Sequence, residues 1–250
     1  MNDLKTLWEN EEKCAIMKGW DFSYIEGRYI EHTDFGWNYQ ELVRKYLKKD
    51  MRILDIDTGG AEVLLSFHHP YHLTSCTEGY APNIKLCEEK LLPLGIDFRS
   101  CDNPETLPFV DNTFDLVINR HGSFDPKELY RVLKKDGLFI TQQVGDQNNR
   151  NLVEFLLPRL PKRLLHWNLG YQKQLLLNEG FEIIEEAEAF RTMDFYDIGA
   201  FVWYAKIIEW EFIGFSVNQC FDSLLKLHDE IQRNGYISGI VHRYMIVARK

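Results

Sequence analysis

Arg52-Ile-Leu-Asp-Ile-Asp-Thr-Gly-Gly-Ala-Glu62 is the stretch of sequence from which the fold can be inferred. It begins as a short apolar run that ends in two carboxylates, Asp55 and Asp57, and a Gly-Gly pair follows. Residues 63–67 then begin a helix. A buried parallel strand, a tight turn and a helix N-terminus fit this order. Glycine permits backbone angles that are closed to other residues, and it lets a ligand approach the main chain.

A further acidic residue lies at the distance expected of a nucleotide site. Glu78 ends a second apolar run, residues 73–77, and lies 23 residues after Asp55. An acidic residue at about that distance is placed to bind the ribose hydroxyls of a nucleotide-like ligand. The glycine pair alone is a weak signal, and the spaced carboxylate strengthens it.

Length and composition favour one domain with an insertion. The chain has 250 residues, of which 45% are hydrophobic and 27% charged, as is ordinary for a globular protein with a full core. The net charge of −9 and the pI of about 5.4 disfavour a broad surface for phosphates. Nucleic acid is therefore a less favoured partner than a small molecule.

The sequence also favours a cytoplasmic protein without a membrane or metal site. No apolar run approaches the roughly 20 residues of a membrane span, and the N-terminus lacks the pattern of a signal peptide. The five cysteines form no Cys-x-x-Cys pair, which predicts a reduced setting without structural zinc. Pro70 interrupts the helix that would align His68, His69 and His72, so we expect no metal there.

Strands and helices alternate along the chain. Seven strands are expected, over residues 52–57, 73–77, 95–100, 113–119, 138–144, 181–190 and 241–248. Helices are expected over residues 3–18, 40–47, 63–67, 82–92, 126–134 and 172–178, and residues 147–169 read as a helix with a loop. This alternation predicts a doubly wound α/β fold, with a mostly parallel sheet and helices on both faces.

Two aromatic-rich segments lie outside this alternation. Residues 1–48 read as a helical and aromatic cover, and residues 191–235 read as a helical insertion whose second helix spans 220–233. The aromatic residues in the first segment either pack over an edge of the core or cover a ligand mouth. Residues 201–212 are read most simply as the core of the inserted helix pair.

Five segments occur in the order and spacing of one known family. They are Asp55-Ile-Asp-Thr-Gly-Gly-Ala61, Glu78, Asp102-Asn103, Leu107-Pro-Phe109 with Phe114-Asp-Leu-Val117, and Tyr130-Arg-Val-Leu-Lys-Lys-Asp-Gly-Leu-Phe139. On these residues the chain resembles the class I S-adenosylmethionine-dependent methyltransferases, from about Arg52 to Gln143. The resemblance implies a Rossmann-like fold whose last strand is antiparallel.

The resemblance implies S-adenosylmethionine as the cofactor. In this family the first strand and its turn lie beside the methionine part, which points to Asp55. The second strand ends in an acidic residue that binds the ribose, which points to Glu78, and an Asp after the third strand contacts the adenine, which points to Asp102. The expected cofactor-binding residues are Asp55, Asp57, Thr58, Gly59, Glu78, Gly79, Asp102, Asn103 and Asn119.

Two residues depart from the family pattern. Glycine is usual where this chain has Asp57 and Ala61, and only Gly59 between them matches. The Asp57 side chain either narrows the pocket or faces the amino group of the cofactor. Ala61 is the milder change, since it adds one methyl group.

The acceptor end of the site is expected just past the fourth strand. Ligands bind in the crevice outside the carboxyl ends of such strands, and His121 follows there. A histidine suits a general base near neutral pH, and the alternative is a loop histidine near a turn. The expected substrate-binding residues are Trp20, Trp37, Tyr39, Arg120 and Trp203. The predicted function is methyl transfer to a small molecule. An RNA methyltransferase and a non-catalytic methyltransferase-like module remain as alternatives.

Overall fold

The computed structural model describes residues 2–16, 21–160 and 166–250, which form two compact units. Unit 1 comprises Met1–Asp34, Asp146–Leu165 and Phe190–His242. Unit 2 comprises Phe35–Gly145, His166–Ala189 and Arg243–Lys250. Most of the predicted N-terminal cover and the predicted insertion therefore belong to one unit, and all the expected cofactor-binding residues belong to the other. Trp20 lies outside the described residues.

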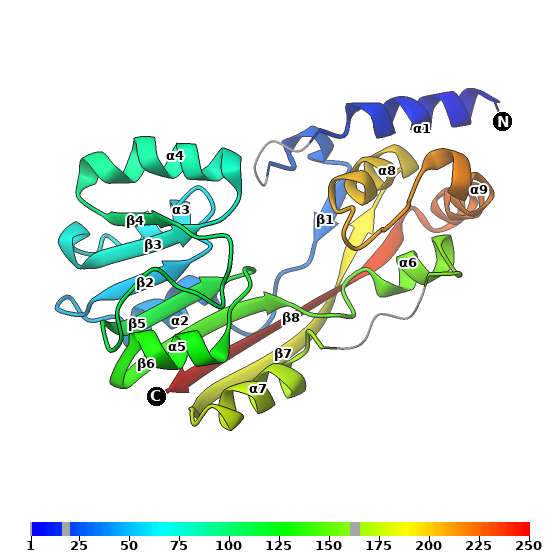
Figure 1. Ribbon diagram of the computed structural model, residues 1–250. Coiled ribbons are helices and arrows are strands. Elements are labelled where there is room, and N and C mark those ends of the chain that lie inside the picture. The colour runs from blue at the N-terminus through cyan, green and yellow to red at the C-terminus, as the bar shows by residue number, and fades with distance from the viewer. Residues whose placement is uncertain (1, 17–20, 161–165) are drawn as a thin grey trace. The chain divides into compact units, whose positions relative to one another are not determined.

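The strands form one sheet in the order β1-β7-β8-β6-β5-β2-β3-β4. Their bounds are β1 Tyr29–Glu31, β2 Ile53–Ile56, β3 Thr74–Glu78, β4 Asp97–Ser100, β5 Phe114–Arg120, β6 Leu133–Val144, β7 Glu182–Phe195 and β8 Ile237–Arg249. The pairs β4–β3–β2–β5–β6 are parallel, and β8 is antiparallel to β6, as predicted. The order reverses between β2 and β5, which is where ligands bind in doubly wound sheets (Figure 1).

Alternating apolar residues on the strands supply a core on each face of the sheet in unit 2. Ile53, Leu116 and Ile140 pack on one face, together with helix residues of α2 (Tyr39–Tyr46) and α4 (Ala81–Leu91). Their strand neighbours Leu54 and Val117 pack on the other face, with α5 (Pro126–Val132) and α7 (Leu169–Asn178). The predicted doubly wound arrangement is confirmed, because both faces of the central strands are covered.

Local sequence signals start the helices of unit 2. The side chains of Asn38, Asp125 and Asn168 each accept a backbone hydrogen bond at the start of α2, α5 and α7, as N-cap residues do. Pro82 lies in the first turn of α4, where its missing N–H costs nothing. A short helix, α3 (Glu62–Leu65), follows the β2 turn. Buried His69 donates from Nε2 to the Met51 carbonyl at 2.8 Å, a structural contact.

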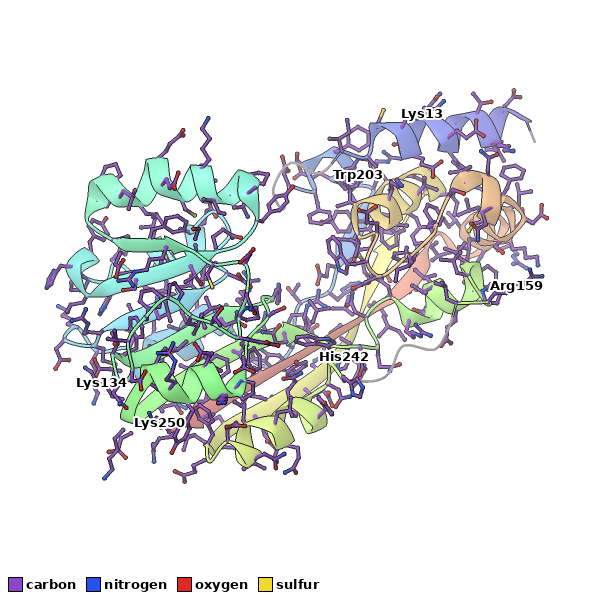
Figure 2. The ribbon with its side chains drawn as sticks, in the orientation of Figure 1. Lys13, Lys134, Arg159, Trp203, His242 and Lys250 are labelled. Atoms are coloured by element: carbon purple, nitrogen blue, oxygen red, sulfur yellow. The ribbon has the colours of Figure 1, made fainter. Side chains whose placement is uncertain are left out.

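Unit 1 contains the predicted helix pair, α8 (Ile198–Ile207) and α9 (Val217–Asn234), with α1 (Asn2–Cys14) and α6 (Arg150–Leu156). Trp203 on α8 (Figure 2) is 3% exposed. Its ring packs against the rings of Tyr24 and Phe22. This matches the interpretation of residues 201–212 as core. None of the helices in the described ranges is both long and apolar enough to cross a membrane.

The sheet differs from the prediction in strand number and length. It has eight strands instead of seven, because β1 pairs antiparallel with residues 193–195 of β7. A three-residue strand shows no periodicity of its own, so only its distant partner reveals it. β6 begins at Leu133, where a helix was predicted to continue to 134, and β7 and β8 extend beyond the predicted 181–190 and 241–248. Pairing with neighbouring strands sets these boundaries more than local composition does.

Candidate cofactor and acceptor site

Three acidic residues meet at the carboxyl edge of the parallel strands in unit 2. β2 pairs with β3 through Asp55↔Cys76, and β3 pairs with β4 through Glu78↔Ser100. Asp55 and Glu78 are both buried, with 6% and 5% of their surface exposed, while Asp102 after β4 is exposed. The sheet therefore brings together the three carboxylates that the sequence had placed at successive strand ends.

The turn after β2 has left-handed backbone geometry at three alternate positions. The φ angles are 56° at Asp57, 62° at Gly59 and 63° at Ala61. L residues with a β-carbon adopt this region at a cost of about 1 kcal/mol or more each. The turn thus keeps the shape that glycine favours at all three positions, although only one of them is glycine. Nothing lies within 4 Å of the point where a β-carbon on Gly59 would be, so its main chain is open to a ligand.

Glu78 holds the loops on both sides of it. Its Oε1 accepts hydrogen bonds from the amides of Gly79 and Tyr80 at 2.9 and 2.8 Å. Its Oε2 accepts from the amide of Gly59 at 2.8 Å and more weakly from Asn83 Nδ2 at 3.4 Å. The carboxylate is therefore fixed in place beside the glycine turn. The weak Asn83 contact is the one that a ligand hydroxyl could replace most easily.

Asp55 and Asp57 are poorly solvated carboxylates that lie near Glu78. Burial raises the pKa of Asp55 to about 7, although Thr58 Oγ1 donates to it at 2.7 Å, and the charges of Asp57 and Glu78 raise it further. Burial and the charge of Glu78 raise the pKa of Asp57 to about 6, while a backbone hydrogen bond from Ser123 opposes this shift. Both groups would be stabilised in their charged form by a nearby cation.

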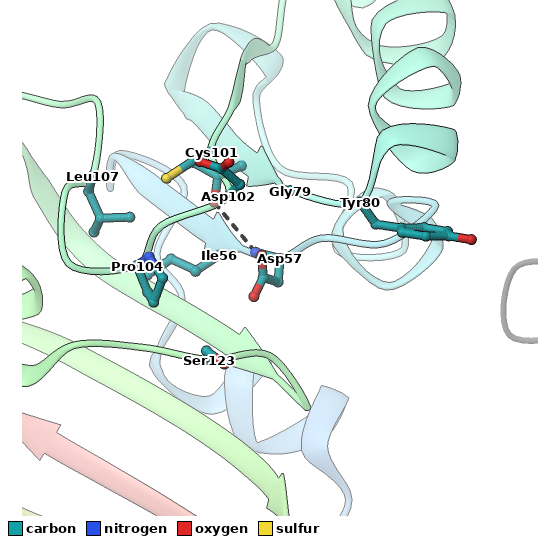
Figure 3. Close-up of a pocket in the computed structure, with 10 residues that line it drawn as sticks. Ile56, Asp57, Gly79, Tyr80, Cys101, Asp102, Pro104, Leu107 and Ser123 are labelled. Carbon is teal, nitrogen blue, oxygen red and sulfur yellow. Dashed lines mark hydrogen bonds between the residues drawn. The ribbon is translucent and has the colours of Figure 1, made fainter. Parts of the chain in front are cut away.

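A pocket of about 190 Å³ lies at this edge of the sheet (Figure 3). It is lined by Ile56, Asp57, Thr77, Gly79, Tyr80, Cys101, Asp102, Pro104, Leu107 and Ser123. Asp57 lies at the boundary with the loop after β5, where a β-carbon on Gly122 would come within 2.5 Å of the Asp57 β-carbon. The Asp57 amide lies 3.4 Å from Thr77 Oγ1, a long contact drawn in Figure 3. The side chain that replaces the family's glycine therefore lies against the β5 loop.

The side chain of Asn119 forms hydrogen bonds to neighbouring strands of the sheet. Its Nδ2 donates to the carbonyl of Ile56 at 3.0 Å, and its Oδ1 accepts from Thr141 Oγ1 at 3.2 Å and from Gln143 Nε2. The residue is fully buried. The structure thus uses this predicted cofactor residue to join β2, β5 and β6.

His121 is held in one tautomer by its neighbours. Trp37 Nε1–H is only a donor, so Gln142 accepts through Oε1 at 2.8 Å and turns its amide nitrogen toward His121 Nε2 at 3.2 Å. Although His121 is exposed at its surface, the protein atoms packed around its ring disfavour the charged form and lower its pKa below 6.5, and the charges of Arg243 and Arg120 act in the same direction. The neutral imidazole therefore accepts at Nε2 and carries its proton on Nδ1. It would act as a base through Nε2 only after its bond to Gln142 is broken.

Tyr39 and Arg120 lie on the same side of the site. The Arg120 guanidinium is 5.9 Å from the Tyr39 ring centroid. Tyr39 is 6% exposed, and its hydroxyl forms no hydrogen bond of normal geometry with the described residues. Burial and the charge of Asp55 raise the pKa of Tyr39 well above 10. Four predicted residues, Trp37, Tyr39, Arg120 and His121, are thus brought together, whereas Trp203 lies in the core of unit 1.

Several residues of the site were not predicted from the sequence. Gln142 fixes the tautomer of His121, Ser123 bonds Asp57, and Thr77 lines the pocket. One signal was available, since Thr141-Gln-Gln143 is a polar run inside a strand that is otherwise apolar. Thr141, Gln142 and Gln143 are all buried. Buried polar side chains need partners, so such a run marks a hydrogen-bonded network.

Solved structures share this architecture. A Bacillus halodurans protein assigned as a methyltransferase has 18% identity and a TM-score of 0.58, over 84% of this chain and 98% of that chain. A Galdieria sulphuraria protein assigned as a sarcosine dimethylglycine methyltransferase has 18% identity and a TM-score of 0.52, over 84% and 82%. The chain has the class I S-adenosylmethionine-dependent methyltransferase fold.

The same fold occurs in a functionally unknown protein from Deinococcus radiodurans, with 12% identity and a TM-score of 0.61 over 88% of this chain and 90% of that chain. No family model and no curated protein matches the sequence. In the methyltransferase fold of this chain, Asp55, Glu78 and Asp102 follow the strands that the sequence resemblance indicated. The fold prediction is therefore confirmed at the level of architecture.

Proposed function

We propose that this chain binds S-adenosylmethionine at the carboxyl edge of β2, β3 and β4 and transfers its methyl group to a small-molecule acceptor. The methyltransferase fold supports the proposal, because ligands of doubly wound folds bind at this edge. The net charge of −9 favours a small acceptor over a nucleic acid.

One observation carries the proposal. The charges of Asp57 and Glu78 raise the pKa of Asp55, the charge of Glu78 raises that of Asp57, and none of the three forms an ion pair with the described residues. Those residues also contain no group of three acidic, His or Cys side chains arranged to hold a metal ion. Carboxylates gathered away from water without a cation are unfavourable. An organic cation such as S-adenosylmethionine, with its sulfonium and ammonium groups, would balance them.

The residues present fit this cofactor in chemistry. In this proposal Glu78 would accept from the ribose hydroxyls, Asp102, which lines the pocket, would meet the adenine, and Asp55 and Asp57 would face positive charge. The pocket volume of about 190 Å³ is below the 300 Å³ or more that encloses a drug-sized ligand. The cofactor would therefore extend from the pocket over the open main chain of Gly59.

When bound, S-adenosylmethionine supplies an activated methyl group that passes from its sulfur to an acceptor nucleophile as the carbon–sulfur bond breaks. The protein then has to hold the acceptor in line with that bond. Tyr39, Arg120 and His121 lie next to the end of β5, beside the loop that contacts Asp57. We assign these residues to acceptor positioning. Among them only His121 has a ring nitrogen that could accept a proton, and it could do so only after the bond between Nε2 and Gln142 is broken.

Asp57 favours a second candidate, a non-catalytic module. Its carboxylate accepts from the Ser123 backbone and packs against Gly122, so it fills part of the turn over which a cofactor would pass. Such a module would bind a ligand in the existing pocket without transferring a methyl group. The two proposals differ in whether bound S-adenosylmethionine is consumed.

Calorimetry with S-adenosylmethionine and S-adenosylhomocysteine tests the proposal. We expect micromolar binding of both, and release of S-adenosylhomocysteine from S-adenosylmethionine when acceptors are supplied. Adenosine and methionine added separately are the controls for partial recognition. If neither S-adenosylmethionine nor S-adenosylhomocysteine binds, the proposal is overturned. Binding without methyl transfer to any acceptor would favour the non-catalytic module.

A further inference from the structure

The acceptor end of the candidate site carries positive charge. Arg120 ends β5, is exposed, and forms no ion pair with the residues that the structure describes. Arg243 lies close enough for its charge to act on His121, as does that of Arg120. Arg120 lies two residues before Gly122, the residue of the β5 loop that contacts Asp57, so this basic residue is close in the chain to the carboxylates of the cofactor end. The site therefore has an acidic end and a basic end.

His121 adds a directed donor to the basic end. Gln142 occupies Nε2, so the ring presents Nδ1–H to an incoming ligand. Desolvation of the ring, together with the two arginine charges, lowers the pKa of His121, so the imidazole is a neutral donor that adds no third positive charge. A neutral N–H beside a guanidinium suits an oxyanion, because both groups donate and neither requires a proton from the ligand.

Tyr39 offers a further donor between the two ends. Its hydroxyl is buried without a hydrogen-bond partner of normal geometry among the described residues, and it responds to the charges of both Asp55 and Arg120. A buried hydroxyl left unbonded costs roughly 1–3 kcal/mol, so a ligand that accepts from it gains affinity. The phenol proton is retained, since its pKa is well above 10.

On this basis we propose that the methyl acceptor is an acidic small molecule, whose carboxylate is bound by the Arg120 guanidinium and by His121 Nδ1–H. This inference rests on the proposed function, because it assigns the substrate class of the same site. A carboxylate takes two parallel hydrogen bonds from a guanidinium, whereas a neutral amide of the same shape takes one and a cationic group is repelled. Arg120 is thus the residue that selects the acceptor class.

The test uses acetate as the probe and acetamide, an uncharged analogue of similar shape, as the control. The ring signals of His121 are followed by NMR in [¹⁵N]histidine-labelled protein, without cofactor and at constant ionic strength. We expect acetate to shift the His121 signals in a saturable way and acetamide to leave them nearly unchanged. In Arg120→Gln the half-saturating acetate concentration should rise at least about fivefold, because the charge-assisted bonds are lost.

Arg52→Gln is the matched control, since Arg52 is an exposed arginine just before β2, at the opposite end of that strand. It should leave the acetate response within about twofold of wild type, as expected for a distant exposed charge. No acetate shift, an equal acetamide shift, or an unchanged response in Arg120→Gln would each overturn the inference; the last would mark an adventitious ion only. Calorimetry with S-adenosylmethionine on the same protein is independent, so its failure would remove the proposed function and not the anion site.

Discussion

Unit 1 and unit 2 each gather carboxylates, and they treat them in opposite ways. In unit 1, Arg28 donates to both oxygens of Asp197 at 2.9 and 2.7 Å and to Glu11 at 2.8 Å. In unit 2, three carboxylates meet and none forms an ion pair among the described residues. The first group is charge-paired within the protein, whereas the second has no cationic partner among the described residues.

The pKa shifts separate the two groups. Hydrogen bonding to Arg28 holds the pKa of Asp197 below its usual value, against the opposing effect of burial. Burial raises the pKa of Asp55 to about 7 and that of Asp57 to about 6, because no cation opposes it. A carboxylate whose pKa is lowered contributes to stability, and one whose pKa is raised reduces stability at neutral pH. Raised values of this kind are common among residues of binding sites, which is consistent with the proposed function of this edge.

The largest effect is expected where the carboxylates are already paired. Arg28→Ala should lower the free energy of unfolding of unit 1 by about 2 kcal/mol, because two carboxylates lose a shared, partly buried partner. Urea unfolding monitored by tryptophan fluorescence measures this. Arg233→Ala, an exposed arginine on α9, is the control and should stay within about 0.5 kcal/mol of wild type. A loss equal to that of the control would show that the network is not stabilising.

The three carboxylates of unit 2 should matter for ligand binding. Glu78→Ala should weaken the binding of S-adenosylmethionine at least tenfold, about 1.4 kcal/mol. The reason is that this carboxylate positions the Gly59 turn and, in the proposed function, accepts from the ribose. Calorimetry measures the affinity, and Glu88→Ala, an exposed glutamate on α4, should leave it unchanged. Glu78→Gln keeps the shape of the side chain and should fall between the two. An unchanged affinity in Glu78→Ala would contradict the assignment of the ribose contact to Glu78.

Removing a buried charge should stabilise unit 2. Asp55 has a pKa of about 7 when folded, above the 3.8 expected when unfolded, so the folded state holds its proton more tightly. Stability from this group is full below about pH 4 and is lost as pH rises toward 7. Asp55→Asn should therefore raise stability by roughly 1–2 kcal/mol at pH 7.5, and the gain should vanish near pH 4.

Thermal unfolding of the Asp55 variant at both pH values checks this expectation. Asp50→Asn, an exposed aspartate in the same unit, is the control and should show no gain at either pH. A gain of the same size at pH 4 would mean that packing, and not charge, is responsible. The affinity for S-adenosylmethionine should fall in Asp55→Asn. The charged carboxylate of Asp55 would then lower the stability of the fold while it strengthens binding of the cofactor.

The smallest effect concerns backbone strain. Ala61→Gly should change stability by less than about 0.5 kcal/mol, because relief of the left-handed φ of 63° offsets the lost methyl burial. Ala205, equally buried within helix α8, has no such strain. Ala205→Gly should therefore cost more than about 1 kcal/mol in the same urea titration. Equal losses would show that the turn is not strained at Ala61.

Much of unit 2 could be predicted from the sequence because its signals are local. Apolar runs marked the strands, and acidic residues at their ends marked the edge where Asp55, Glu78 and Asp102 meet. Parallel strands put such ends together whatever the loops do, so order and spacing were enough. The helix pair of unit 1 was also apparent, since an aromatic-rich segment and the helical segment after it had no place in the alternation.

What could not be predicted depends on residues far apart in the chain. The tautomer of His121 follows from Trp37 through Gln142, which is 105 residues later than Trp37. The contact of Asp57 with Gly122 and Ser123 depends on how two loops approach each other. Trp203 was expected to bind substrate although residues 201–212 were read most simply as core, and its packing against Tyr24 agrees with core. Aromatic composition alone does not tell these roles apart.

The antiparallel pairing of β6 with β8 has a consequence for how the chain is made. Residues 138–144 leave the ribosome early, but their partners at 243–249 follow only after the whole segment 190–242 of unit 1. Until then, one edge of β6 presents unpaired amides and carbonyls to the cell, and such edges attract other chains. A chain that ends within α9 would contain every proposed cofactor-binding residue but would leave this edge of β6 without its partner strand. Such an unpaired edge favours aggregation.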